Sequence, residues 1–118
     1  MNKKGVLLFV ASSAVLCCMV ACSGSVEKVE YRNERGQLER FERRKKDFAK
    51  EGLYQRFDEK GVLLEEAHYE NDTLEGERKY FYPNGSLESV EHYSHGIYHG
   101  KYLKYYDSGT LQVEQEFV

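Results

Sequence analysis

The sequence of 118 residues repeats itself with a period of 24 residues. Two sets of glycines follow this period, Gly52, Gly76 and Gly100 in one set and Gly61, Gly85 and Gly109 in the other. Aromatic and leucine positions keep the same step; they are Phe57, Phe81 and Tyr105, then Leu63, Leu87 and Leu111, then Tyr69, Tyr93 and Phe117. A period of this length indicates stacked supersecondary units, and excludes a single irregular core.

Each repeat has the features of a β-hairpin. Residues 58–61, 83–85 and 107–109 are turn signals, and Asn-Gly at 84–85 is the strongest of them. Residues 71–72 and 94–96 mark the turns at the other end, and the runs between are rich in residues that favour strands. We expect the repeated glycines to have a positive φ or to lie close to neighbouring backbone. The sequence thus predicts an all-β fold, an elongated antiparallel meander of repeated hairpins.

Alternation of side chains along a strand predicts which residues share a face. One predicted set contains Leu63, Glu65, Ala67 and Tyr69. A second set is our candidate binding face, and contains Tyr80, Tyr82, Tyr102 and Tyr106. We expect cross-strand packing from Phe57, Phe81 and Tyr105 with Leu63, Leu87 and Leu111. An open row of tyrosines would suit binding, because a large rigid ring loses little entropy. The alternative is that these rings only stabilise the sheet.

The pattern is weaker upstream of Gly52. Residues 31–38 resemble a degenerate turn unit, and the spacing from Gly36 to Gly52 contains one residue more than the later repeats, which we place in the basic stretch 43–46. Residues 38–51 are open to two interpretations, a strand followed by a loop or a helix ended by Gly52. The helix rests on the spacing of Leu38, Phe41, Lys45 and Phe48. The neighbouring repeats favour the strand and loop.

The N-terminus has the pattern of a lipoprotein signal. A short basic start precedes an uncharged apolar run, which is short for a membrane span of about 20 residues. The segment 19–22 resembles a bacterial lipobox, with Ala21 before the cysteine that receives the lipid. We therefore predict a signal peptide over 1–21, lipidation at Cys22, a short tether over 22–30 and a repeat domain over 31–118. The resemblance to bacterial lipoproteins implies that a chain with Ser23 after the cysteine is transported to the outer membrane, where the cell has one.

Cysteine and charge counts limit the mature chain. All three cysteines lie within 17–22, so cleavage before Cys22 leaves no intramolecular disulfide. Loss of Lys3 and Lys4 with the signal peptide changes the formal charge from −3 to −5. Residues 61–118 carry only four basic against eleven acidic side chains. This balance argues against a nucleic-acid partner, because phosphate contacts need clustered Lys and Arg. The basic stretch 43–46 could contact anionic head groups, but its acidic neighbours favour a solvated loop.

Residue types that carry chemistry occur without the patterns that catalysis needs. The histidines lack cysteine ligands and metal spacing; they are His68, His92, His95 and His99. Paired acids could serve glycoside hydrolysis, but a small repetitive sheet seldom supplies a dry pocket. The acids considered are Glu65, Glu66, Glu70, Asp72, Glu75, Glu77, Glu88 and Glu91. We expect no metal, no cofactor and no enzymatic activity.

The repeats resemble MORN-type repeats in a variant form. The resemblance rests on GERKYFYPNGSL at 76–87, GKYLKYYDSGTL at 100–111 and GLYQRFDEKGVL at 52–63. It covers about residues 30–118, and the variant resembles the bacterial YwqK-type antitoxins. The resemblance implies an elongated sheet that acts as an interaction module for proteins or membranes.

These observations lead to a hypothesis of function. We expect an envelope lipoprotein that is held to a membrane by its lipid and binds a protein partner without catalysis. An antitoxin or immunity protein is the alternative among binding modules. A hydrolase with paired carboxylates and a purely structural spacer are the alternatives from other classes.

Overall fold

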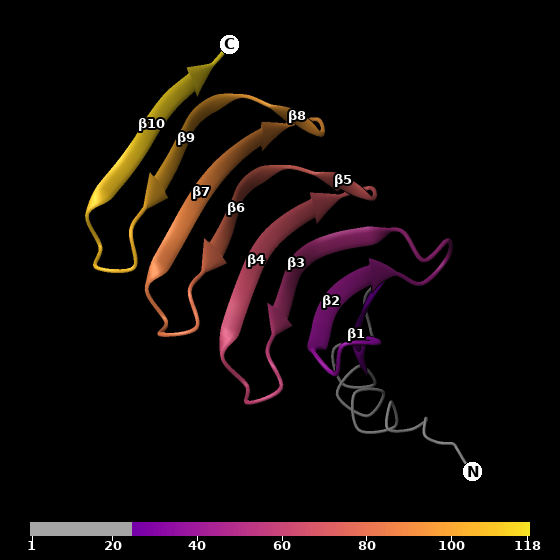
Figure 1. Ribbon diagram of the computed structural model, residues 1–118. Coiled ribbons are helices and arrows are strands. Elements are labelled where there is room, and N and C mark those ends of the chain that lie inside the picture. Colours follow the sequence, from indigo (N-terminus) through magenta and orange to yellow (C-terminus); the bar gives the residue numbers. More distant parts are fainter. Residues whose placement is uncertain (1–24) are drawn as a thin grey trace.

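The computed structural model describes residues 25–118, so the predicted signal peptide and Cys22 lie outside the described residues. The described residues form one antiparallel sheet (Figure 1). Its strands are β1 (Val26–Arg32), β2 (Leu38–Arg44), β3 (Lys50–Phe57), β4 (Leu63–Glu70), β5 (Thr73–Leu74), β6 (Gly76–Phe81), β7 (Leu87–Ser94), β8 (Ile97–Tyr98), β9 (Gly100–Tyr105) and β10 (Leu111–Phe117). The predicted all-β meander is confirmed.

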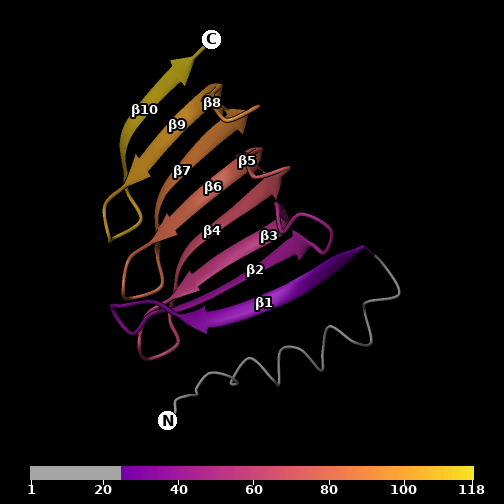
Figure 2. The ribbon, with the colours of Figure 1, turned by 90° about the vertical axis from the view of Figure 1, so that its right-hand side faces the viewer.

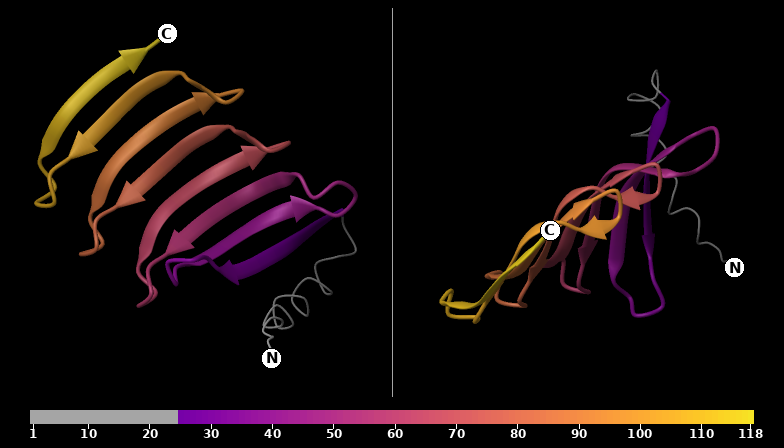
Figure 3. Two further views of the ribbon diagram at one scale, coloured as in Figure 1. Left: turned by 45° about the vertical axis from the view of Figure 1, so that its right-hand side comes forward. Right: turned by 90° about the horizontal axis from the view of Figure 1, so that it is seen from above.

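The strands follow one another across the sheet in chain order. The path runs β1-β2-β3-β4-β6-β7-β9-β10, while the short strands β5 and β8 pair with the ends of β4 and β7. Figures 2 and 3 show one curved layer, and no second layer covers either face of the described part. Among residues 25–118 there is no helix that is long and apolar enough to cross a membrane.

The upstream region continues the meander. Residues 38–44 are the strand β2 and residues 45–47 form a turn before β3, so the helical interpretation of 38–51 is wrong and the strand with a loop is confirmed. The sheet also begins earlier than expected. β1 starts at Val26 and pairs along its whole length with β2, which leaves the predicted tether over 22–30 too long.

One turn type closes the hairpins at one end of the sheet. The amides of Gly36, Gly61, Gly85 and Gly109 each donate a hydrogen bond to the carbonyl three residues earlier. The φ angles of these glycines lie between 78° and 97°, a region that side chains with a Cβ seldom occupy. The positive φ predicted for the repeated glycines is therefore confirmed, and the turn at Gly36 is the degenerate unit seen in the sequence.

A shift of register beside each of the last three turns changes which side chains meet. Between Arg56 and Phe57 the opposite strand has one extra residue, so Phe57 pairs with Leu63 and Arg56 pairs with Glu65. Phe81 and Tyr105 pair with Leu87 and Leu111 in the same way. The cross-strand pairs expected from the sequence are confirmed. The predicted face of Leu63, Glu65, Ala67 and Tyr69 is wrong at Leu63, because a residue inserted in a ladder breaks the two-residue alternation.

Burial is concentrated in the middle of the sheet, where neighbouring side chains cover one another. The buried residues are Ala49, Tyr54, Glu65, Ala67, Ser89 and Val90. No large side chain in the described part is completely buried, as expected for a single layer. Backbone ladders and cross-strand contacts must therefore supply most of the stability.

Candidate functional site

One face of the sheet carries seven of the ten tyrosines. Directly paired residues of neighbouring strands point to the same side, and the side alternates along each strand. The register places these tyrosines together; they are Tyr31, Tyr54, Tyr69, Tyr80, Tyr93, Tyr98 and Tyr102. We call this side of the sheet the tyrosine face.

The structure places the four predicted tyrosines in two settings. Tyr80 and Tyr102 lie on the tyrosine face, in β6 and β9. Tyr82 and Tyr106 lie just outside these strands, where the glycine turns begin. The Tyr82 hydroxyl donates to the Tyr105 carbonyl at 2.7 Å, and Tyr106 is 51% exposed. The other five tyrosines of the face were missed, and only the strand register could have grouped them.

An ion-pair cluster occupies the centre of the tyrosine face. Glu65 is 5% exposed, and its carboxylate lies 2.9 Å from Arg56 Nη2 and 2.7 Å from Arg78 Nη2. The Arg78 guanidinium also lies over the Tyr80 ring, 5.0 Å from its centroid. Burial alone would lower the pKa of Arg78, but the charge of Glu65 and its hydrogen bonds outweigh burial and raise it. The carboxylate is therefore held by two cations.

A second carboxylate orders the aromatic rings at the β1–β3 end. Glu39 Oε1 accepts hydrogen bonds from the hydroxyls of Tyr31 at 3.0 Å and Tyr54 at 3.2 Å. Burial alone would raise the pKa of Glu39, but hydrogen bonds from Asn33 and the two tyrosines lower it. Burial and the nearby carboxylates raise the pKa of Tyr54. Ring contacts continue along the face through Tyr31, Phe41, Tyr54 and Tyr69.

A third carboxylate orders the aromatic rings at the β7–β10 end. Glu91 accepts hydrogen bonds from Tyr93 at 2.9 Å and from Tyr98 at 3.3 Å, one on each oxygen. The Tyr93 and Tyr98 rings stack with centroids 4.9 Å apart, and Tyr98 stacks on Phe117 at 5.2 Å. Tyr98 is 43% exposed and Phe117 is 38% exposed. This end of the face is therefore an ordered aromatic surface that remains open to solvent.

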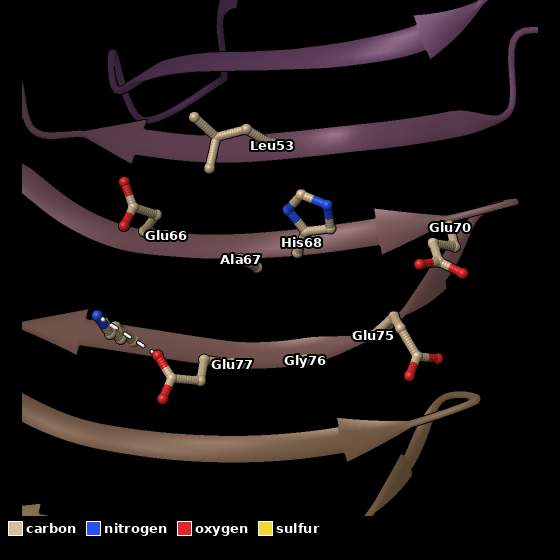
Figure 4. Close-up of a pocket in the computed structure, with 9 residues that line it drawn as sticks. Leu53, Glu66, Ala67, His68, Glu70, Glu75, Gly76 and Glu77 are labelled. Carbon is tan, nitrogen blue, oxygen red and sulfur yellow. Dashed lines mark ion pairs between the residues drawn. The ribbon is translucent and has the colours of Figure 1, made fainter.

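The opposite face holds an open hollow of about 420 Å³ between β3, β4 and β6 (Figure 4). Four of the residues around it are acidic, and His68 lies among them; the acidic residues are Glu66, Glu70, Glu75 and Glu77. Beside the hollow, β4 and β6 pair directly only at 65–66 with 79–80. No group of three or more potential metal ligands occurs among residues 25–118. His95 and His99 lie around β8, away from the lining of this hollow.

The basic stretch 43–46 is largely engaged within the sheet. Arg43 pairs with Glu27 at 2.8 Å, and Arg44 pairs with Asp47 at 2.7 Å. Hydrogen bonds from Arg44 lower the pKa of Asp47 to about 2. Lys45 also has a contact within the molecule. Arg43 and Arg44 belong to β2 and only residues 45–46 lie in the turn, so the predicted loop is shorter than expected. These pairings favour a role of the stretch within the sheet over contact with anionic head groups.

Comparison with known proteins identifies the repeats. A family model described as "MORN repeat variant" matches residues 50–71, 74–95 and 98–118, which together make up more than half of the chain. Each matched segment covers one of the hairpins that the glycine period marks. No curated protein matches the chain. MORN repeats are in general modules that contact proteins or membranes.

Proposed function

The chain belongs to the MORN repeat variant family, and from this premise we propose that it is a cell-envelope lipoprotein that binds a protein partner through its tyrosine face, without catalysis. The observation that carries the proposal is the ordered and exposed aromatic surface formed by Tyr93, Tyr98 and Phe117. Glu91 already fixes the two tyrosine hydroxyls, so these rings lose little conformational entropy when a partner covers them.

The state of the carboxylates supports a role without catalysis. Hydrolysis by paired acids needs one carboxyl group with a raised pKa in a closed site. Glu65 is instead held by two arginines, and hydrogen bonds lower the pKa values of Glu39 and Asp47. The acids Glu66, Glu70, Glu75 and Glu77 line a hollow that is open to solvent. An open hollow differs from the closed site that such a reaction needs.

The membrane anchor in the proposal rests on the sequence around Cys22, which lies outside the described residues. The test is a Cys22→Ser variant expressed in cells and compared with the wild type by membrane fractionation and mass spectrometry. We expect the wild type in the membrane fraction with an acylated N-terminal cysteine, and the variant released from it. An unmodified and uncleaved wild type would contradict the lipoprotein proposal.

The binding role is tested by crosslinking in cells followed by pull-down. The test variant is Tyr98→Ala with Tyr102→Ala, and the control is Leu53→Ala, which removes an exposed apolar side chain from the opposite face. Circular dichroism confirms that both variants are folded. We expect a specific protein to be captured by the wild type and the control and lost from the test variant. Equal capture by all three would contradict binding at the tyrosine face, and no capture by any would favour a spacer.

The same experiment distinguishes the antitoxin alternative. A captured toxin whose activity is suppressed by the purified chain would make this protein a neutralising partner of the YwqK type. A captured structural protein of the envelope would instead favour a scaffold. Both results agree with binding at the tyrosine face.

A further inference from the structure

Arg56 and Glu65 form an ion pair whose repeat equivalents are different residues. Arg56 of β3 lies opposite Glu65 of β4 in the ladder, and their charged groups are 2.9 Å apart. Two repeats later the basic position is occupied by Lys104. The acidic position is occupied by Ser89 one repeat later and by Val113 two repeats later. The cation is therefore kept in the last repeat, while the carboxylate that neutralises it is not.

Lys104 lies between the two residues that replace this glutamate. In the ladder it pairs with Ser89 of β7 on one side and with Val113 of β10 on the other. Lys104 forms no ion pair with any of residues 25–118. Ser89 is only 6% exposed, and its hydroxyl makes no hydrogen bond within the same part of the chain. A cation and a buried polar group thus lie side by side without an anion.

Two tyrosines add hydroxyl donors to the same face around Ser89 and Lys104. Tyr80 lies opposite Ser89 in the ladder, and Tyr102 is two residues from Lys104 on the same face. Burial, followed by the charge of Glu65, raises the pKa of Tyr80 to about 12, so its hydroxyl keeps its proton at neutral pH. Phenolic hydroxyls and an ammonium group are all donors to a carboxylate.

We propose that Lys104, Tyr80, Tyr102 and Ser89 form a subsite on the tyrosine face for an acidic side chain of the protein partner. The subsite rests on the proposed function and adds to it the chemistry of the partner. Glu65 shows within the same molecule how this face holds a carboxylate, since its two oxygens each meet a guanidinium. At Lys104 the partner's Asp or Glu takes the place that Glu65 occupies two repeats earlier.

The most direct test introduces a carboxylate at the position of the last repeat that is equivalent to Glu65. Val113→Glu puts an acid opposite Lys104, as Glu65 lies opposite Arg56, and so occupies the subsite from within. Lys104→Met removes the charge and keeps the length of the side chain. Lys101→Met is the matched control, because Lys101 lies on the opposite face and pairs with Glu114 at 3.2 Å. Thermal unfolding of each purified variant shows whether it is folded.

The probe is a random-peptide phage library selected against the wild-type protein. We expect the selected peptides to share an Asp or Glu at one position. Their synthetic copies should bind Lys104→Met and Val113→Glu about tenfold more weakly, the effect of losing one charge-assisted hydrogen bond, and Lys101→Met unchanged. If Val113→Glu does not fold, the peptide affinity of Lys104→Met alone tests the subsite.

The results separate the two proposals. Peptides that lose binding to Tyr102→Ala but share no acid, or that bind Lys104→Met as well as the wild type, would overturn the subsite and leave the tyrosine face as a binding surface. A selection that yields no peptide dependent on Tyr98 or Tyr102 would contradict the proposed function, and the subsite with it.

Discussion

At the scale of single residues, the Glu65 carboxylate is the charge that the described part of the sheet buries most deeply. A buried carboxylate loses its hydration and must regain that free energy from its partners. Arg56 and Arg78 supply it with short contacts to both oxygens. The sequence predicted the strand that carries Glu65. It did not distinguish Glu65 from the many other acidic residues, so its burial between two arginines was not predicted. The pair of arginines comes from two different strands, and only the register brings them together.

Replacement of Glu65 should therefore destabilise the fold strongly. Glu65→Gln leaves two partly buried guanidinium groups without their anion, and we expect a loss of about 3 kcal/mol in the free energy of unfolding. Urea denaturation followed by circular dichroism measures the change. Glu66→Gln is the control, since Glu66 lies on the opposite face and, among residues 25–118, accepts a single hydrogen bond, from Gln55, and forms no ion pair. Equal losses from both variants would show that the ion-pair cluster does not stabilise the sheet.

Glu39 should make stability depend on pH in the acid range. Its pKa is lowered in the folded chain from the ordinary value of 4.5, so its contribution is fully present above that value and is lost as the pH falls through the folded pKa. The difference in urea midpoint between the wild type and Glu39→Gln should shrink as the pH is lowered from about 6 to about 3. Denaturation curves at several pH values test this. A difference in urea midpoint that does not change with pH would show that the ionised form of Glu39 does not stabilise the fold.

At the scale of the elements, the glycine period predicted the turns because each turn needs one residue with a positive φ. The register shift next to each of the last three turns had no such signal. One extra residue in a ladder changes which face Leu63 joins, and no particular residue type marks it. The sequence also grouped Tyr82 and Tyr106 with Tyr80, although both lie where the strands have ended. The hairpins were predictable, and the composition of each face near the turns was not.

Substitution of Gly85 tests the turn itself. Gly85 has a φ of 92°, and apart from its chain neighbours no atom of the described residues lies within 4 Å of the position that a Cβ would take, so backbone strain sets the cost. We expect Gly85→Ala to lower the stability by about 1–2 kcal/mol. Gly85→Asn should cost less, because asparagine tolerates a left-handed backbone better. Thermal unfolding ranks the two. An alanine variant as stable as the wild type would mean that the turn relaxes to another conformation.

At the scale of the whole molecule, the sheet is a one-dimensional stack in which each hairpin contacts its immediate neighbours. Such a stack has no common core that would force all units to open together. The middle strands contain the buried residues, among them Glu65 and Ala67 in β4. β10 is exposed at almost every position, and among the described strands only β9 pairs with it. Stability should therefore decrease from the middle of the sheet toward β10.

Hydrogen exchange of backbone amides measures this gradient. We expect the amides of β10 that are bonded to β9 to have protection factors at least about tenfold lower than those of β4, which corresponds to ~1.4 kcal/mol in opening free energy. Glu65→Gln should lower the protection of β3, β4 and β6 more than that of β10, because Glu65 joins arginines of β3 and β6. Equal protection in β4 and β10, lowered equally by the substitution, would show that the sheet opens as one cooperative unit. In that case a partner that binds at Lys104 would raise the amide protection of every hairpin. In a graded sheet the same partner would raise the protection of the last repeats only.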